Sequence, residues 1–179
     1  MKQFNLLIGL VCIYSIFCSA ENQLKLISGA KIGNGVSIFL SDIEFQKQLF
    51  QQTTGYVRFG GASYTLPDIR SGTVTAEVTQ VSLGARAYIG RIYFGLGYEY
   101  NSLNLINSST NTYADGSFSG PTVEIGNEIK FGPIVTAISI GAQLARVNLD
   151  FKEDEFNTGL LKDGQSILTK LECSIGYLF

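Results

Sequence analysis

The sequence contains no histidine and no tryptophan, and it has only three prolines and three cysteines in 179 residues. Without histidine, the serine–histidine pairing that activates the nucleophile of many hydrolases is excluded. Charged residues are also few, at 16% of the chain, and thirteen Lys and Arg are balanced by fifteen Asp and Glu. No basic cluster can follow a phosphate backbone, so nucleic acid is excluded as an expected partner.

The chain is instead rich in apolar, aromatic and small residues. Hydrophobic residues make up 45% of it, with twelve Phe, nine Tyr and twenty Gly. This composition is typical of a β-rich protein of one domain that buries or contacts apolar material.

The first twenty residues predict a secretory signal peptide. Lys2 precedes an apolar run from Phe4 to Phe17, and small residues at Cys18 and Ala20 occupy the positions that a signal peptidase reads. We therefore expect cleavage before Glu21 and a mature domain of residues 21–179. A lipoprotein acylated at Cys18 is an alternative, and so is an uncleaved anchor, although the apolar run is shorter than the roughly twenty residues of a spanning helix.

After Glu21 the hydrophobic period is close to two, which predicts long β-strands. Six are regular, at residues 55–64, 81–89, 91–103, 121–131, 133–145 and 166–179, and two more, at 23–32 and 36–50, bring the number to eight. The strand at 36–50 changes phase near Asp42, where we expect a β-bulge. No later apolar run is long enough for a spanning helix, so the chain could enter a membrane only as a closed barrel.

The connections between these strands are of two kinds. The segments "IGRI" and "FGP" predict tight turns, whereas Asn104–Gly120 and Asn148–Gln165 are long, polar and predicted to be loops. Short turns at one end of a barrel and long loops at the other are typical of outer-membrane barrels.

The chain ends on a strand whose alternate residues are apolar or aromatic, with Ile175, Tyr177 and Phe179 last. This ending resembles the carboxy-terminal signature of bacterial outer-membrane proteins, and the mature chain resembles their small eight-stranded group, which includes the OmpA membrane domain, OmpX and Opa-like surface proteins. The resemblance implies an all-β, antiparallel up-and-down transmembrane barrel in the outer membrane of a Gram-negative bacterium. It also implies a monomer without cofactors, with membrane lipid as its surroundings and Phe179, Tyr177 and Ile175 as a signal for the barrel-assembly machinery.

A soluble sandwich or lipocalin-like barrel is the alternative fold. The second face of the strands decides against it, because that face carries Gly, Ser, Ala, Tyr and a few charges of both signs rather than a continuous polar surface. Those residues suit a tight barrel interior. Cys173 and Arg146 have the lipid-facing parity, and we expect Arg146 to lie at the outer interface, where a cation is tolerated.

Several charged residues share the interior parity and are expected to form ion pairs that plug the barrel. They are Arg58, Arg86, Glu99, Glu124, Glu128, Lys130, Lys170 and Glu172. A narrow ion path is the alternative, since charges within a membrane often mark pathways. A carboxylate site of Glu124 and Glu128 is the only catalytic arrangement we could consider. The favoured function is a non-enzymatic surface protein whose loops serve adhesion, membrane integrity or host contact, and the alternative is a narrow channel or transporter for small or hydrophobic solutes.

Overall fold

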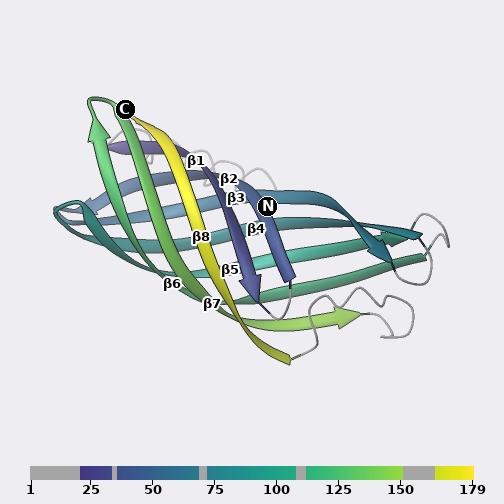
Figure 1. Cartoon of the computed structure of the whole chain (residues 1–179). Coiled ribbons are helices and arrows are strands. Elements are labelled where there is room, and N and C mark those ends of the chain that lie inside the picture. Colours follow the sequence, from purple (N-terminus) through teal and green to yellow (C-terminus); the bar gives the residue numbers. More distant parts are fainter. Residues whose placement is uncertain (1–20, 34–35, 69–71, 108–111, 151–163) are drawn as a thin grey trace, which may run out of the picture.

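The computed structural model describes residues 21–33, 36–68, 72–107, 112–150 and 164–179. Eight antiparallel strands pair with their sequence neighbours, and β8 pairs with β1, so that the sheet closes into a barrel (Figure 1). The strands are β1 (Asn22–Gly33), β2 (Val36–Phe50), β3 (Thr53–Asp68), β4 (Gly72–Ile89), β5 (Ile92–Asn107), β6 (Thr112–Phe131), β7 (Ile134–Asp150) and β8 (Gly164–Leu178). The predicted fold class and strand number are therefore confirmed. No helix long and apolar enough to cross a membrane occurs among these residues.

One end of the barrel, here named the turn end, carries three two-residue connections. They are residues 51–52, 90–91 and 132–133. Gly90 and Gly132 begin two of them with φ of 63° and 60°, a left-handed conformation that tight hairpins need and glycine adopts without strain. Both ends of the described chain also lie here, since Asn22 and Phe179 exchange two backbone hydrogen bonds of 3.1 and 3.0 Å.

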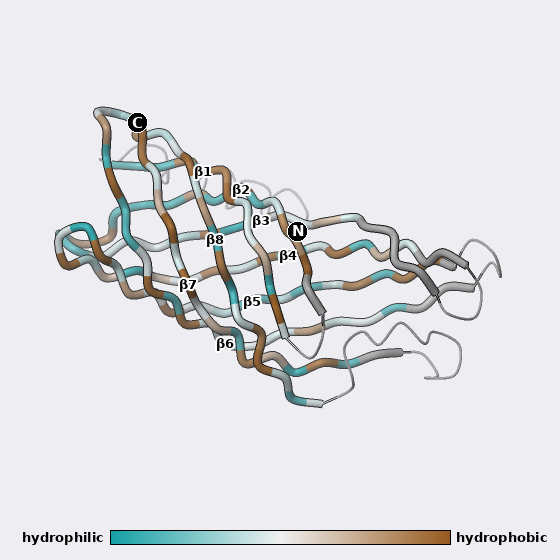
Figure 2. Tube along the Cα trace, in the orientation of Figure 1, coloured by the Kyte–Doolittle hydropathy of each residue, from teal (hydrophilic) through white to brown (hydrophobic). Residues whose placement is uncertain are grey.

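Buried and exposed side chains alternate along the strands, as the period of two predicts. In Figure 2 the hydropathy of successive residues accordingly changes back and forth along much of the sheet. Outward positions are mostly aliphatic or aromatic and exposed; Leu96, Ile138 and Leu171, for example, are 68%, 62% and 52% exposed. Inward positions are mostly polar, charged or small toward the turn end, although Ile27 and Val135 are apolar and buried there. A surface of exposed aliphatic side chains around a polar interior is the arrangement that a barrel surrounded by lipid requires.

At the opposite end, here named the loop end, this polarity reverses. The inward side chains there are apolar and nearly inaccessible, and we name them the apolar cluster: Ile38, Leu40, Ala76, Val78, Leu103, Leu105, Phe118, Ala145, Val147 and Leu168. On β5 the outward residues change from Leu96, Tyr98 and Tyr100 to Ser102 and Asn104 where the inward residues join the apolar cluster. The loop end therefore has an apolar core, and its outer surface is mainly polar on β4 to β7, whereas Ile32, Phe39 and Ile167 on β1, β2 and β8 are apolar and exposed there.

The loop predicted at 104–120 is largely wrong, and the loop predicted at 148–165 is wrong at its two ends. Residues 104–107 belong to β5 and 112–120 to β6, and their strands pair with each other as far as Asn107 and Thr112. Likewise, Asn148–Asp150 belongs to β7, and Gly164 and Gln165 to β8. Residues 108–111 and 151–163 of these predicted loops lie outside the described residues. The polar composition of these strand ends is explained by the reversed polarity of the loop end.

The wall of the barrel divides between β2 and β3 near the loop end. Their pairing stops at Ser41 and Gly61, although β2 continues to Val36 alongside β1 and β3 continues to Asp68 alongside β4. Figure 1 shows the end of β3 diverging from the hairpin of β1 and β2. The bulge predicted near Asp42 is wrong, since β2 pairs with β1 in continuous register through that residue, and the irregularity lies instead between Gln48 and Phe50.

Candidate functional site: the charged interior

Among the side chains that the structure describes, eleven charged ones lie buried inside the barrel, contributed by seven of its strands, β7 being the exception. Five are cations, Lys25, Lys31, Arg58, Arg86 and Lys170, and six are carboxylates, Asp42, Glu44, Glu99, Glu124, Glu128 and Glu172, so their formal sum is 5 − 6 = −1. A buried charge is tolerated only when it is paired and hydrogen-bonded. Because positive and negative charges are present in nearly equal numbers, the buried charges can be paired.

Glu44 of β2 lies between two arginines from the next two strands. Its Oε2 accepts hydrogen bonds from Arg58 Nη2 at 2.9 Å and from Arg86 Nη2 at 2.8 Å, and its Oε1 accepts another from Arg86. Arg86 Nε also donates to Glu124 at 2.6 Å, and Arg58 Nη1 donates to Glu172 at 2.7 Å. Two guanidinium groups thus connect three carboxylates from β2, β6 and β8, with the fork geometry that suits arginine.

The chain of charges continues toward the loop end through Lys170. Its Nζ lies 3.1 Å from Glu172 Oε1 and donates to Glu99 Oε2 at 3.0 Å. Glu99 accepts a second charged donor, Lys31, which also donates to Asn101 Oδ1 at 3.0 Å. The network ends where Lys31 Nζ lies 5.7 Å from the ring centre of Phe118, a member of the apolar cluster.

Toward the turn end the network ends on an ion pair between a lysine and a glutamate. Lys25 Nζ donates to Glu128 Oε2 at 2.6 Å and to Gln46 Oε1 at 2.9 Å. The amide nitrogen of Gln46 donates to Tyr88 and Thr54, and the Tyr88 hydroxyl donates to Glu128 at 3.1 Å. Each polar group of Gln46 therefore has a partner, which makes this layer well connected.

Two tyrosine rings fill the space beside the arginines. The guanidinium carbon of Arg86 lies 4.4 Å from the ring centre of Tyr56 and 4.9 Å from that of Tyr93, distances of cation–π contacts. Glycines on the facing strands make room for these rings, because a Cβ on Gly84 would lie 2.6 Å from the Tyr56 hydroxyl. Alternate glycines in β4 to β6 are thus explained by the bulk of the side chains opposite them.

The filled interior leaves little space for a passing solute. Among the described residues, the cavity beside Arg58 and Arg86 has a volume of only about 10 Å³, which is the room for roughly one water molecule. The apolar cluster covers the loop-end side of the network. Taken together, the described layers hold charges in fixed positions and fill the interior with side chains.

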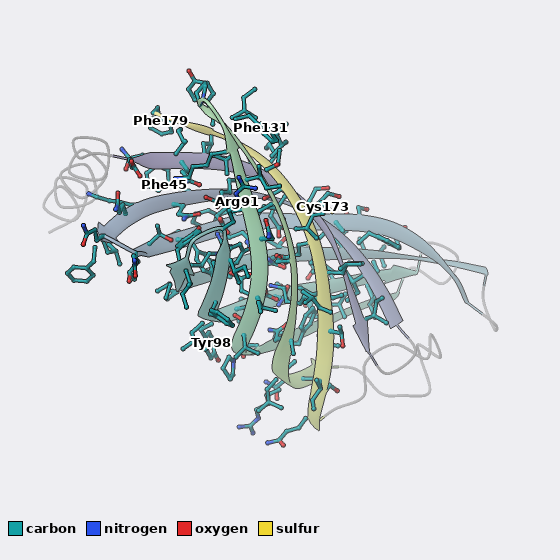
Figure 3. All side chains as sticks on the ribbon, turned by 60° about the vertical axis from the view of Figure 1, so that its left-hand side comes forward. Phe45, Arg91, Tyr98, Phe131, Cys173 and Phe179 are labelled. Atoms are coloured by element: carbon teal, nitrogen blue, oxygen red, sulfur yellow. The ribbon has the colours of Figure 1, made fainter. Side chains whose placement is uncertain are left out.

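A larger cavity of about 530 Å³, here named the vestibule, opens at the turn end. Its lining includes the polar residues Gln23, Gln48, Thr54 and Tyr88 and the exposed charged residues Glu21, Arg91 and Lys130. Figure 3 brings this end forward and labels Arg91 there. Glu128 also borders the vestibule, so the charged network begins at its inner wall.

No protein-family model matches the sequence, and no curated protein sequence matches it either. Solved structures are similar in fold. Ail, the attachment invasion locus protein of Yersinia pestis, solved with the heparin analogue sucrose octasulfate, has a TM-score of 0.57 at 10% identity and covers 90% of this chain and 100% of its own. Neisserial surface protein A scores 0.55 at 8% identity over 89% and 96%, and CarO of Acinetobacter baumannii scores 0.51 at 12% identity over 92% and 99%. The chain has the fold of the small outer-membrane β-barrels.

Within this outer-membrane barrel fold, seven of the eight predicted interior charges lie buried in the network: Arg58, Arg86, Glu99, Glu124, Glu128, Lys170 and Glu172. Lys130 has the same parity but lies exposed at the rim of the vestibule, because β6 ends one residue later. The prediction missed Lys25, Lys31, Asp42 and Glu44, which are buried on β1 and β2. Parity would have found Lys25 and Lys31, since β1 alternates cleanly between them and apolar outward residues.

The three residues of the predicted assembly signal all point outward at the turn end. Ile175, Tyr177 and Phe179 are each between 52% and 56% exposed. The ring centre of Phe179 lies 6.4 Å from that of Phe45, and Figure 3 labels Phe131 close by at the same end. Arg146 and Cys173 are outward and exposed.

Proposed function

We propose that the protein is a non-enzymatic surface protein of the outer membrane, with a plugged barrel that presents its loop end to the outside. The observation that carries this proposal is the combination of an apolar outer surface with an interior filled by ion pairs and capped by the apolar cluster. Such a barrel is suited to hold its loop end at the membrane surface and is not suited to conduct ions.

Contact with a host or with surface ligands, adhesion and support of membrane integrity are the roles that we propose for the loop end. The similarity in fold to Ail, an attachment protein whose structure holds a heparin analogue, supports adhesion among these roles. A polar outer face on β5 to β7 above the apolar surface supports exposure to water on that side, because Asn104, Asp115 and Asn148 point outward there.

The route to the membrane belongs to the same proposal. Residues 1–20 are proposed to be a signal peptide that is removed before Glu21, so that β1 starts one residue into the mature chain. Lipid would then surround the barrel, and the assembly machinery would read Phe179, Tyr177 and Ile175. The outer membrane of a Gram-negative bacterium is the location that this route implies.

The decisive experiment combines migration and conductance of the purified protein. Heat-dependent migration on a gel, with a β-rich spectrum in detergent, is expected of a folded membrane barrel. In planar bilayers the same sample should give no steady single-channel steps. Unchanged migration together with purely soluble behaviour would contradict the membrane barrel, and reproducible steps would contradict the plug.

A narrow channel or transporter is the second candidate, and one observation favours it. Polar and charged groups follow one another without a break from Glu128 at the vestibule to Lys31 below the apolar cluster. A path for ions or small solutes through the barrel would require the apolar cluster to move. Replacing Leu105 with Ser inside that cluster should leave a plugged barrel silent, whereas a gated channel would begin to conduct.

A further inference from the structure

Two grooves lie on the outer face of the same three strands, β5 to β7. The first, here named the polar groove, has a volume of about 470 Å³ and lies over Ser102 and Ser117 near the loop end. The second, here named the apolar groove, has a volume of about 390 Å³ and lies over Val123 and Ala142, closer to the turn end. Both volumes fall within the roughly 300–1,000 Å³ that is usual for ligand sites.

The polar groove offers hydrogen-bonding groups that are free to meet a ligand. Ser102, Ser117 and Asn148 line it, and within the described part of the chain their hydroxyl and amide groups have no hydrogen-bond partner. Tyr100, which is 50% exposed, borders the groove toward the turn end, and Asp115 borders it toward the loop end. Asp115 is the only charged residue among the described residues that line this groove. A ligand that carries both donors and acceptors, and no strong negative charge, therefore fits it.

The apolar groove lies within the outward surface of aliphatic side chains. Ile125 pairs with Ile140 and Val123 with Ala142 across β6 and β7, and Phe94 borders the groove on β5. The small side chain of Ala142 leaves room between these larger ones. Because the outward side chains that line this groove are apolar, an acyl chain is the part of a ligand that suits it.

The spacing of the two grooves matches one leaflet of a membrane. Ser117 in the polar groove and Val123 in the apolar groove are six positions apart on β6, which is about 20 Å at the usual rise of a strand. Strands of membrane barrels are tilted by about 40°, so the separation along the membrane normal is about 15 Å, half of the roughly 30 Å hydrocarbon core. Tyr98, labelled in Figure 3, lies between the grooves on β5 and donates to Ser119 at 3.2 Å, as suits an aromatic side chain at a membrane interface.

We propose that β5 to β7 bind one membrane lipid with a sugar headgroup, which places the sugar in the polar groove and an acyl chain in the apolar groove. This inference rests on the proposed outer-membrane barrel and adds a lipid site to it. Sugar hydroxyls both donate and accept, so they can pair with the serines, the amide of Asn148 and the carboxylate of Asp115 together. A choline headgroup has no N–H or O–H to donate. An ethanolamine headgroup can donate to Asp115 but brings its phosphate close to the same carboxylate, and it is an outcome that the experiment distinguishes.

Tryptophan quenching by brominated lipids measures which lipid lies at the site. The chain has no tryptophan, and Leu96 pairs with Val123, so Leu96→Trp reports contact beside the apolar groove. The variant is placed in phosphatidylcholine vesicles in which a small, equal fraction of lipid is brominated on its acyl chains, either diglucosyl diacylglycerol or phosphatidylcholine with the same chains. The dependence of quenching on that fraction should give the glycolipid an affinity about tenfold higher than that of phosphatidylcholine, the preference that one or two net hydrogen bonds provide.

Variants in the Leu96→Trp background test the two grooves separately. Ser117→Leu fills the polar groove and Ala142→Phe fills the apolar groove, and each should abolish the preference for the glycolipid. Ser63→Leu, which changes an outward, exposed serine on β3, is the matched control and should leave the preference unchanged. Phe59→Trp, on the outer face of β3 and outside both grooves, should be quenched equally by the two brominated lipids. Heat-dependent migration verifies that each variant folds.

Four results would overturn the lipid site. They are equal quenching of Leu96→Trp by the two brominated lipids, the same glycolipid preference at Phe59→Trp, a preference that survives both Ser117→Leu and Ala142→Phe, and brominated phosphatidylethanolamine that binds as tightly as the glycolipid. The last result would assign the polar groove to an ammonium group. Quenching without a preference contradicts the lipid site alone, whereas no quenching of either tryptophan by any brominated lipid contradicts the membrane barrel itself.

Discussion

At the scale of single residues, the interior is held by a few side chains with several partners each. Arg86 is the most connected, because it donates to Glu44, Gln46 and Glu124 and lies over two tyrosine rings. Arg86→Met keeps most of the volume but leaves two carboxylates without their main counterion. Breaking a buried pair in this way costs about 3–5 kcal/mol, so we expect a loss of that size in the free energy of unfolding, measured by urea titration in lipid vesicles.

The matched control for that variant is Arg146→Met, which changes an outward, exposed arginine on β7. It should shift the free energy of unfolding by less than about 0.5 kcal/mol. Neutralising a partner as well, in Arg86→Met with Glu44→Gln, should recover part of the loss, since the two residues are in contact and couple. Equal effects of Arg86→Met and Arg146→Met would contradict the structural role of the network.

At the scale of strands, the register of β7 assigns opposite surroundings to two nearby residues. Ile140 is 52% exposed on the outer face, whereas Gln143 is fully buried and its amide donates to the carbonyl of Glu99 at 3.4 Å. Ile140→Arg should cost roughly 2–4 kcal/mol in the middle of a bilayer, and Gln143→Ala about 1 kcal/mol. Unfolding titrations in vesicles measure both, and a spin label at 143 that contacts lipid would contradict the register.

The division between β2 and β3 predicts where backbone amides exchange fastest. Alternate amides of Val36–Leu40 and Ala62–Asp68 face the division and lack a strand partner. About half of the amides in these segments should therefore exchange with solvent faster than those of Leu103–Asn107, which pairs on both sides at the same end. Hydrogen exchange read by mass spectrometry or NMR measures this, and equal protection of the three segments would mean that the wall is continuous.

The strands that could be predicted from sequence are those whose surroundings stay constant along their length. On β7 and β8 the outward side is apolar in the predicted range except at Thr136 and Thr169, so the alternation indicated both strand and parity. On β2 the inward side changes from polar Asp42 and Glu44 to apolar Leu40 and Ile38. The side chains still alternate between the two faces, but the inward face is no longer always the polar one. This change of polarity suggested a bulge and hid two charges of the network.

The same change of surroundings explains the loops that were predicted in place of strands. Above the apolar surface, the outward residues of β5 and β6 are mostly Ser, Asn and Asp, with Ile106 as an exception, as in a strand exposed to water. Period-two patterns of small polar residues resemble loop composition, so only strand pairing in three dimensions reveals them. Which charges form pairs is likewise a result of the closed barrel, since Arg58 and Glu172 are 114 positions apart.

At the scale of the whole molecule, Phe179 and an aromatic outer rim lie together at the turn end. Phe179 closes the barrel through its backbone bonds with Asn22, and its side chain stays outward. If this ending is an assembly signal, deleting Phe179 should lower the amount of protein in the outer membrane while export across the inner membrane continues. Fractionation with detection in each compartment tests this, with Gln52→Ala, which changes an exposed turn residue at the same end, as the control; normal insertion without Phe179 would contradict the signal.

The change of polarity along the barrel also predicts how deeply it sits in the bilayer. The chain has no tryptophan, so a single introduced tryptophan reports its own position without background. On the outer face of β5 we expect brominated lipid to quench Leu96→Trp strongly, Tyr100→Trp partly and Asn104→Trp hardly at all. The physical reason is that Leu96 lies within the apolar surface, Tyr100 has the amphipathic ring usual at a membrane interface, and Asn104 belongs to the polar outer face of the loop end. Fluorescence in vesicles of matched lipids measures the three variants in one series, and strong quenching of Asn104→Trp would mean that the loop end is embedded, with its polar outer face in lipid.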